Sequence, residues 1–172
     1  MTNYCGTVIV CKPRPLFPER SASVLTKKGK YGLKAMVYLA GFKPGQVVPV
    51  MEIATAQSIP KKFLDVILCE LKNAGFVNSK MGKGGGYMLA SPANEIGVGA
   101  IVRAIDGPLA PLPCASKTRY QPCDDCRDEA HCAVRLVMLE AQQAIVNVLD
   151  NCTLAEMQAM TTADDQHLMY HI

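Results

Sequence analysis

The sequence predicts a mainly α-helical fold with a small β-hairpin wing, in the form of a winged helix-turn-helix domain followed by a long dimerisation helix. Two observations support this fold class. Apolar residues recur at helical spacing over residues 59–74, and two short apolar runs then flank a glycine-rich turn at residues 80–86. Further along, apolar residues alternate at steps of four and three from residue 134 to residue 152, which is the pattern of a helix that packs along another helix.

Changes in composition and periodicity divide the 172 residues into five segments. Residues 1–23 hold three prolines and no sustained periodicity, so we expect a flexible N-terminal extension there. The winged helix-turn-helix domain is expected at residues 24–107, and a cysteine-rich loop at residues 108–132. A dimerisation helix and a short C-terminal helix are expected at residues 133–160, and a loose tail at residues 161–172.

The charges are distributed unevenly along the chain. Residues 24–90 contain ten Lys and Arg against three Asp and Glu, whereas residues 91–172 contain five against eleven. A basic half of this kind indicates a polyanionic partner, although ordinary solvation of the surface is the alternative. No apolar run is long enough to span a bilayer and the first residues make a poor signal peptide, so we expect a cytoplasmic protein without a membrane partner.

The first half of the chain predicts three helices. Thr26 is a suitable N-cap for a helix that runs to about Ala40, and residues 50–57 suit a short second helix. Pro60 fits the first position of the third helix, and Gly75 fits the left-handed residue that stops it. Because only two residues separate the second and third helices, they are expected to form a helix-turn-helix.

The third helix has an apolar face and a basic start, and short strand candidates follow it on either side of the glycine-rich turn. The apolar face, which we expect to be buried, comprises Phe63, Leu64, Ile67, Leu68 and Leu71. A helix and hairpin of this kind are typical of a recognition helix and wing, although any amphipathic helix before a hairpin gives the same pattern. The sequence therefore predicts a DNA-binding unit, with phosphate or base contacts from Lys27, Lys28, Lys30, Lys61, Lys62, Lys80 and Lys83.

Two details of this unit bear on DNA contact. The lysines near the start of the first helix oppose the helix dipole, a placement that is reasonable if they face phosphates. Asp65 has two interpretations, because it could accept a hydrogen bond from a cytosine amino group or form a local ion pair with Lys61 or Lys62.

Three further helices are expected in the second half of the chain. One spans residues 93–107, a long one spans residues 130–152, and a short one, capped by Thr153, spans residues 154–160. The long helix is apolar on two sides, so it packs against a second copy of the chain or within its own domain; the small size of the basic half favours the dimer. The predicted dimer seam comprises Val134, Met138, Ala141, Ile145 and Val148, with Cys152 at its end.

Four of the eight cysteines lie within nineteen residues of a proline-rich loop: Cys114, Cys123, Cys126 and Cys132. In a cytoplasmic chain such cysteines favour free thiols or metal ligands over disulfides. Thiolates at these spacings can converge on one soft metal ion or on an iron–sulfur cluster, and a metal site is favoured over inert thiols.

The order of these motifs resembles the Rrf-two family of bacterial winged-helix regulators over roughly residues 24–160. The resemblance rests on residues 25–33, on the Ala74-Gly75 helix stop and on the run Gly84-Gly85-Gly86-Tyr87-Met88-Leu89. It implies that the helix after Pro60 lies in the major groove and that the hairpin reaches a neighbouring minor groove. Many members carry arginine in the wing where this chain has Met81.

The resemblance also implies a role for the cysteine loop. IscR-like and NsrR-like members hold an iron–sulfur cluster through three cysteines at this place. Cys126 and Cys132 match the last spacing, and Cys114 is the natural first member, so Cys123 is either an extra ligand or a substitute for Cys126. The resemblance favours a 2Fe–2S cluster over a 4Fe–4S cluster, and zinc is the alternative.

The fourth ligand of such a cluster is not matched. IscR-like members have a histidine where this chain has Arg135, and NsrR-like members have an acidic residue where it has Lys30. The candidates that remain are Cys123, His131, Asp125 and Glu129.

These observations predict a homodimeric, DNA-binding transcriptional regulator of a palindromic operator, which senses redox state, nitric oxide or iron–sulfur status through its cysteine loop. The sequence contains no catalytic constellation, so we expect no enzyme. Three alternatives remain open at this point: a zinc-structured adaptor that binds a protein partner, a cluster-free thiol redox sensor, and an electron-transfer protein.

Overall fold

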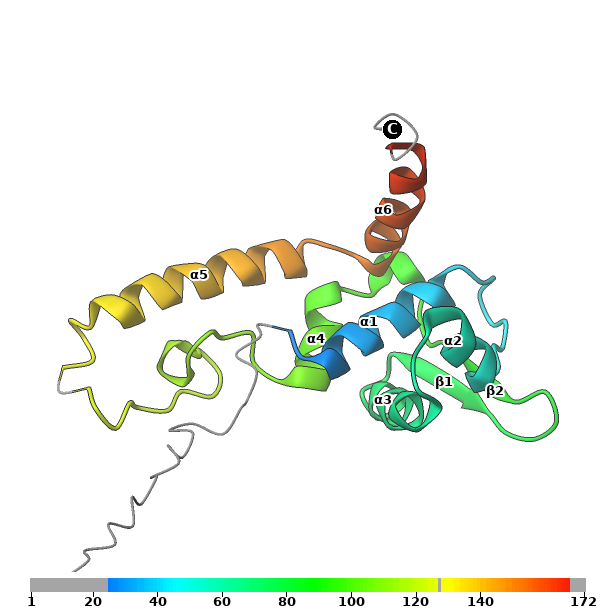
Figure 1. Cartoon of the computed structure of the whole chain (residues 1–172), viewed down its shortest axis with the longest axis horizontal. Helices are drawn as coiled ribbons and strands as arrows, with labels where there is room; N and C mark the ends of the chain where they lie inside the picture. The colour runs from blue at the N-terminus through cyan, green and yellow to red at the C-terminus, as the bar shows by residue number, and fades with distance from the viewer. Residues whose placement is uncertain (1–24, 127, 168–172) are drawn as a thin grey trace, which may run out of the picture.

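The computed structural model describes residues 25–126 and 128–167, so the extension expected at residues 1–23 lies outside the described residues. The elements are α1 Lys27–Ala40, α2 Val50–Gln57, α3 Lys61–Asn73, β1 Val77–Lys80, β2 Gly86–Leu89, the 3-10 helix η1 Ala93–Glu95, α4 Val98–Asp106, the 3-10 helix η2 Pro113–Ala115, α5 Ala133–Asp150 and α6 Leu154–His167. Figure 1 shows a body built from α1 to α4 and the hairpin, from which α5 extends to one side. The mainly helical fold with a β-hairpin wing is confirmed. Within the described ranges, no helix is long and apolar enough to cross a membrane.

The core surrounds α1, which packs against α2, α3, α4 and α6. Met36 on α1, Leu64 and Ile67 on α3, and Ile101 on α4 are completely buried. Burial of side chains of this size stabilises a fold by about 1.5–3 kcal/mol each. Leu154, at the start of α6, is buried in the same cluster, so the C-terminal helix is anchored to the N-terminal ones.

The start of α1 is fixed by its cap and by the end of α4. The Thr26 hydroxyl accepts a hydrogen bond from the Gly29 amide at 3.1 Å, which confirms the predicted N-cap. The same hydroxyl donates to the Asp106 carboxylate at 2.5 Å, and the Thr26 amide donates to it at 2.9 Å. These bonds orient the first turn of α1, where Lys27, Lys28 and Lys30 lie.

The pair α2–α3 forms the predicted helix-turn-helix. Ser58 has a left-handed conformation with φ 52°, and the Ile59 amide donates to the Ala54 carbonyl at 2.9 Å. Pro60 is the N-cap of α3 rather than its first helical residue, because its backbone is still extended with ψ 127°. At the other end of α3, Gly75 has φ +83°, which confirms the predicted left-handed stop.

The wing is a two-stranded antiparallel hairpin in which Val77 lies opposite Leu89. Val48, which precedes α2, exchanges backbone hydrogen bonds with Tyr87 on β2 at 2.8 and 2.9 Å, so the hairpin is fixed to the helix-turn-helix. A Cβ atom at Gly86 would collide with the Val48 carbonyl oxygen. Only glycine permits this close approach of two backbones.

The single helix predicted at residues 93–107 is wrong in its first part. A 3-10 turn is followed by extended backbone at Ile96, and only then does α4 begin. The reason is a pairing with the chain that follows α5: the Leu154 amide donates to the Ile96 carbonyl at 2.8 Å, and the Val98 amide donates to the Cys152 carbonyl at 2.9 Å. No local sequence pattern indicates bonds between segments so far apart.

The long helix is shorter at both ends than the predicted range 130–152. Ala130 lies in a turn, because the Asp128 carboxylate accepts hydrogen bonds from the amides of Ala130 and His131 at 3.1 and 3.2 Å. At the other end the helix stops before Cys152. That residue packs against the core of its own domain, so its predicted place in a helical seam is wrong.

The last helix is longer than predicted, since α6 continues past Met160 to His167. Residues 161–167 are therefore helical rather than part of a loose tail, and residues 168–172 lie outside the described ranges. The predicted cap is confirmed: the Thr153 amide donates to the Glu156 carboxylate at 2.8 Å, and the Thr153 hydroxyl accepts from the Glu156 amide at 3.2 Å. Hydrogen bonds from Thr153 lower the pKa of Glu156.

The close approach at Gly86 gives the first prediction. Gly86→Ala is expected to lower the free energy of unfolding by about 1–3 kcal/mol, because the added methyl group meets backbone that cannot move aside. Gly97→Ala is the matched control: Gly97 has φ −77° and a Cβ there meets nothing within 4 Å. The control should change the free energy of unfolding by less than about 0.5 kcal/mol, because the entropic gain from alanine is offset by the loss of a preferred N-cap residue. Urea unfolding of both variants measures the difference, and equal stabilities would contradict the proposed steric reason.

Candidate DNA-binding face and cysteine loop

The helix α3 buries one face and presents the other to solvent. Leu64, Ile67, Leu68 and Leu71 are completely buried, as predicted. Phe63 was expected on that face, but 61% of it is exposed. It lies at the edge of the apolar stripe and lines a surface hollow with Val66 and Ile67. Val66, which the sequence analysis did not single out, is 55% exposed on the same helix.

The seven predicted DNA-contacting lysines occupy three elements: the first turn of α1, the first turn of α3 and the wing. All are exposed except Lys28, which is half-buried. Lys28 forms an ion pair with Glu70 on α3 at 2.6 Å, and Lys61 forms one with Asp65 at 2.7 Å. The local interpretation of Asp65 is therefore the one present in this structure.

The remaining lysines are available to an external anion. In the described part of the chain, Lys30, Lys62, Lys80 and Lys83 form no ion pair, and Lys27 lies over the ring of Tyr31 at 5.7 Å. The structure brings Lys28 and Lys62 to one hollow on the surface of α3, whereas Lys80 and Lys83 lie in the wing. This distribution suits a ligand that spans the helix and the hairpin, as duplex DNA does.

The cysteine loop runs from η2 to the start of α5, and its four thiols lie in two pairs. Cys114 is buried and hydrogen-bonds to Cys123, and this bond raises the pKa of Cys123 to about 11. Partial burial and the neighbouring Cys132 raise the pKa of Cys126. The pKa of Cys132 is lowered, chiefly by the Arg135 backbone amide in the first turn of α5. Cys132 is thus ionised to a thiolate more readily than Cys123 or Cys126.

These pairs do not yet form a single ligand set. Among the described residues, no group of three or more Cys, His, Asp or Glu side chains is close enough to hold a metal ion. The chemistry of the donors nevertheless suits a soft metal or a cluster, because four thiols lie on one loop and the pKa of one of them, Cys132, is lowered. That all four bind one group stays a prediction.

His131, another predicted candidate for the fourth ligand, has a local role. The His131 ring contacts the Asp128 carboxylate at 2.8 Å, and this contact lowers the pKa of Asp128. Arg135 occupies the place of a ligand histidine in IscR-like chains. Its guanidinium donates to the Cys114 carbonyl at 3.0 Å and lies 5.8 Å from the centre of the Tyr120 ring. Arg135 therefore ties the first cysteine of the loop to α5, a role that sequence reasoning missed.

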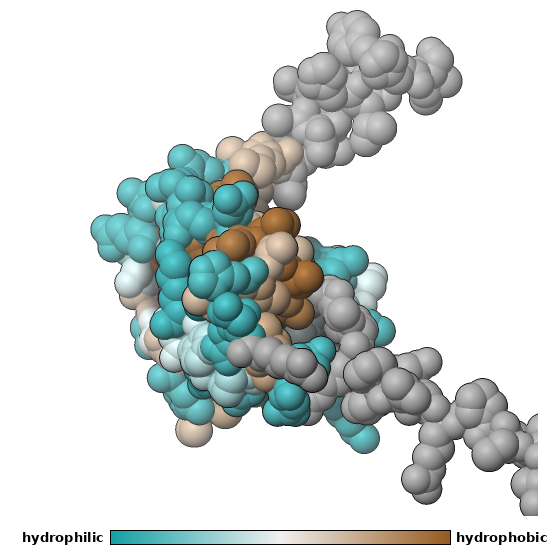
Figure 2. Space-filling model, turned by 90° about the vertical axis from the view of Figure 1, so that its left-hand side faces the viewer, coloured by the Kyte–Doolittle hydropathy of each residue, from teal (hydrophilic) through white to brown (hydrophobic). Residues whose placement is uncertain are grey.

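The helix α5 exposes apolar side chains along much of its length. Val134, Leu136, Val137 and Val148 are between 49% and 69% exposed. Seen from the side of the molecule that carries the cysteine loop, hydrophobic residues gather between hydrophilic ones (Figure 2). Monomeric soluble proteins rarely expose an extended apolar surface of this kind, so it indicates an interface with a partner.

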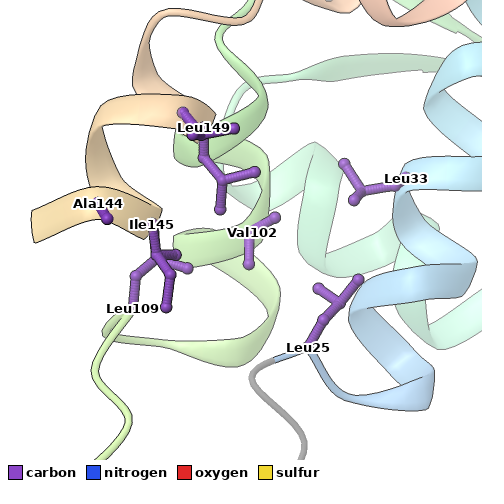
Figure 3. Close-up of a pocket in the computed structure, with 8 residues that line it drawn as sticks. Leu25, Leu33, Val102, Leu109, Ala144, Ile145 and Leu149 are labelled. Carbon is purple, nitrogen blue, oxygen red and sulfur yellow. The ribbon is translucent and has the colours of Figure 1, made fainter. Parts of the chain in front are cut away.

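The C-terminal part of α5 faces its own domain across a cavity of about 420 Å³ (Figure 3). The cavity is lined by Leu25, Leu33, Val102, Leu109, Ala144, Ile145, Val148 and Leu149. Of the predicted seam, Val134 and Val148 are exposed, Met138 and Ala141 are half-buried, and Ile145 packs partly against the core of its own domain. That the seam forms a dimer stays a prediction.

Comparison with known proteins identifies the family. The profile described as Rrf2, iron-dependent transcriptional regulator, matches residues 25–160. The chain belongs to the Rrf2 (Rrf-two) family. An HTH-type transcriptional regulator named as rrf2-like, from Rhodobacter capsulatus, is 44% identical over 139 residues, which cover 79% of this chain and 93% of the relative.

Solved structures of Rrf2 regulators have the same fold. CymR (YrzC), the global cysteine regulator of B. subtilis, is 30% identical with a TM-score of 0.65, covering 79% of this chain and 96% of CymR. IscR of T. potens is 30% identical with a TM-score of 0.60, covering 80% of this chain and 87% of IscR. The chain is thus an Rrf2-family transcriptional regulator with a DNA-binding winged helix, and it is not an enzyme.

The contrast between the loop thiols can be measured by alkylation. At pH 7.5 and without metal, iodoacetamide is expected to label Cys132 about tenfold faster than Cys123, because the lower pKa leaves more of Cys132 as thiolate. Raising the pH to 9.5 should narrow the difference, since the thiolate fraction of Cys123 still rises steeply with pH while that of Cys132 approaches its limit. Peptide mass spectrometry gives both rates. Equal rates at pH 7.5 would show that the start of α5 does not activate Cys132.

Proposed function

We propose that this chain is a homodimeric regulator that binds a palindromic operator and whose cysteine loop holds an iron–sulfur cluster. The observation that carries the proposal is the position of the loop. It lies between the DNA-binding domain and the start of α5, and it contains four thiols within nineteen residues. The likeness to T. potens IscR supports a cluster, and we place the regulator in the cytoplasm.

A bound cluster would supply iron that reacts with oxidants or nitric oxide, and Cys114, Cys126 and Cys132 are the residues that would hold it, with Cys123 as a fourth ligand. The chain's own contribution is mechanical. Cys132 precedes the first turn of α5, and the Cys114 carbonyl accepts from Arg135 on the same helix. A rearrangement of the loop therefore moves the start of α5. In a dimer that packs along α5, this motion changes the spacing of the two recognition helices.

The cluster is tested on protein purified without oxygen. Wild-type protein is expected to absorb in the visible range and to contain iron and acid-labile sulfide in equal amounts. Cys126→Ala combined with Cys132→Ala should lose both, whereas Cys69→Ala, which removes an exposed cysteine on α3, should keep them. Stoichiometric zinc without sulfide would show a structural zinc site in place of the cluster. Wild-type protein without any metal would contradict both the cluster and the zinc site.

A second function is favoured by the thiol pairs themselves. Cys114 with Cys123, and Cys126 with Cys132, could each form a disulfide. In that reaction each pair would give up two electrons and two protons to a peroxide. Hydrogen peroxide would be reduced to water, and an organic hydroperoxide to an alcohol and water. Such a thiol switch needs no cluster, and a gain of two disulfides in metal-free protein after peroxide treatment would identify it.

The dimer gives a separate prediction. Val134→Glu is expected to weaken self-association about tenfold or more, because it puts a carboxylate into an apolar contact between copies of α5. Met160→Glu, at a residue of α6 that is 60% exposed, is the control and should leave association unchanged. Sedimentation equilibrium measures both. If Val134→Glu remains as strongly dimeric as the wild type, the interface lies elsewhere.

A further inference from the structure

The solvent side of the recognition helix carries two unusual apolar side chains. Phe63 and Val66 are 61% and 55% exposed, although Leu64 and Ile67 beside them are completely buried. Residues three apart on a helix are neighbours on its surface, so Phe63 and Val66 form one apolar patch. This patch lies on the first two turns of α3, the part of a recognition helix that reaches the base edges.

Lysines surround the patch, and the carboxylates of α3 near it are already paired with lysines. Lys28, Lys62, Phe63, Val66 and Ile67 line a hollow of about 310 Å³. Both acidic side chains of α3 are occupied: Asp65 by Lys61, and Glu70 by Lys28. An apolar patch with lysines at its edge is complementary to a ligand that presents apolar groups between two rows of anionic groups.

The major groove of DNA is such a ligand, and the only apolar group that it displays is the thymine 5-methyl. The exposed side of α3 offers few other means of reading bases. The stretch from Lys61 to Glu70 contains no Arg, Asn or Gln. Of the two lysines at its start, which can hydrogen-bond to guanine, Lys61 is already paired with Asp65. Lys62 apart, sequence discrimination by this helix therefore depends on apolar contacts.

We propose that Phe63 and Val66 determine operator specificity by contacting thymine methyl groups in the major groove. The inference rests on the proposed binding of α3 to the operator and specifies what the helix reads there. Lys62, which forms no ion pair with any described residue, fixes the helix against a neighbouring phosphate, which supports affinity rather than base choice.

The test compares thymine with deoxyuracil, which pairs identically and lacks only the methyl group. Preferred duplexes are first selected from a random library with wild-type protein, and each thymine of the selected site is then replaced in turn. At the contacted positions we expect about a fourfold loss of affinity per methyl, the ratio that corresponds to one buried methyl group. Replacements at the other thymines should have no effect.

Variants assign the effect to residues. Phe63→Ala and Val66→Ala should bind the thymine duplex more weakly and bind the matching deoxyuracil duplex no worse than the thymine one. Both side chains are exposed, so the variants should keep the wild-type circular dichroism spectrum. Lys80→Ala, in the wing, is the control: it should weaken both duplexes equally and reduce the salt dependence, because it removes a phosphate contact.

The outcomes separate this inference from DNA binding itself. Tight binding without sensitivity to any thymine methyl, or full sensitivity in both Phe63→Ala and Val66→Ala, overturns the inference and leaves the regulator standing. If no duplex is selected and none binds even at low salt, the proposed operator binding fails together with the inference.

Discussion

The junction between α4 and α5 is the constraint on which the rest of the structure depends. The Arg103 guanidinium donates to the Asp150 carboxylate at 2.6 Å, and this bond raises the pKa of Arg103. Gly99 lies directly beneath the same carboxylate, where a Cβ would collide with it. Together with the backbone pairing between Val98 and Cys152, these contacts hold the C-terminal end of α5 on the DNA-binding domain.

The two ends of α5 thus have different roles. Its C-terminal end is fixed to the body by an ion pair, by backbone hydrogen bonds and by apolar packing of Val146 and Leu149. Its N-terminal end contacts the cysteine loop through Arg135 and exposes Val134. Because α5 is fixed at its C-terminal end, a displacement of its N-terminal end would change the direction of the helix axis. In a dimer along α5, that direction determines whether two recognition helices match one operator.

Local patterns in the sequence were sufficient to predict the DNA-binding domain. The Thr26 cap, the left-handed Gly75 and the apolar period of α3 each act over a few residues, so they can be recognised without the fold. The split of the helix expected at 93–107 could not be predicted, because it depends on hydrogen bonds to the chain after α5.

The sequence indicated which residue types belong to the candidate site better than it indicated how those residues are arranged in space. The four cysteines could be recognised from their spacing, but their arrangement in pairs depends on how η2 packs against α5. The exposure of Phe63 was missed because helical periodicity indicates where a residue lies around the helix axis. It does not indicate how much of the helix circumference the core covers. The signal that could have revealed it was an excess of apolar residues over what one face of α3 can bury.

The central claim is that the state of the cysteine loop controls DNA binding through α5. The most direct test measures the affinity of anaerobic protein for a selected operator before and after treatment that removes iron, on the same sample and at one salt concentration. The account predicts a change of about tenfold or more, equivalent to a coupling free energy of about 1.4 kcal/mol. The change should be absent when Cys126 and Cys132 are both replaced by alanine. Equal affinities of the wild-type protein with and without iron would contradict the account.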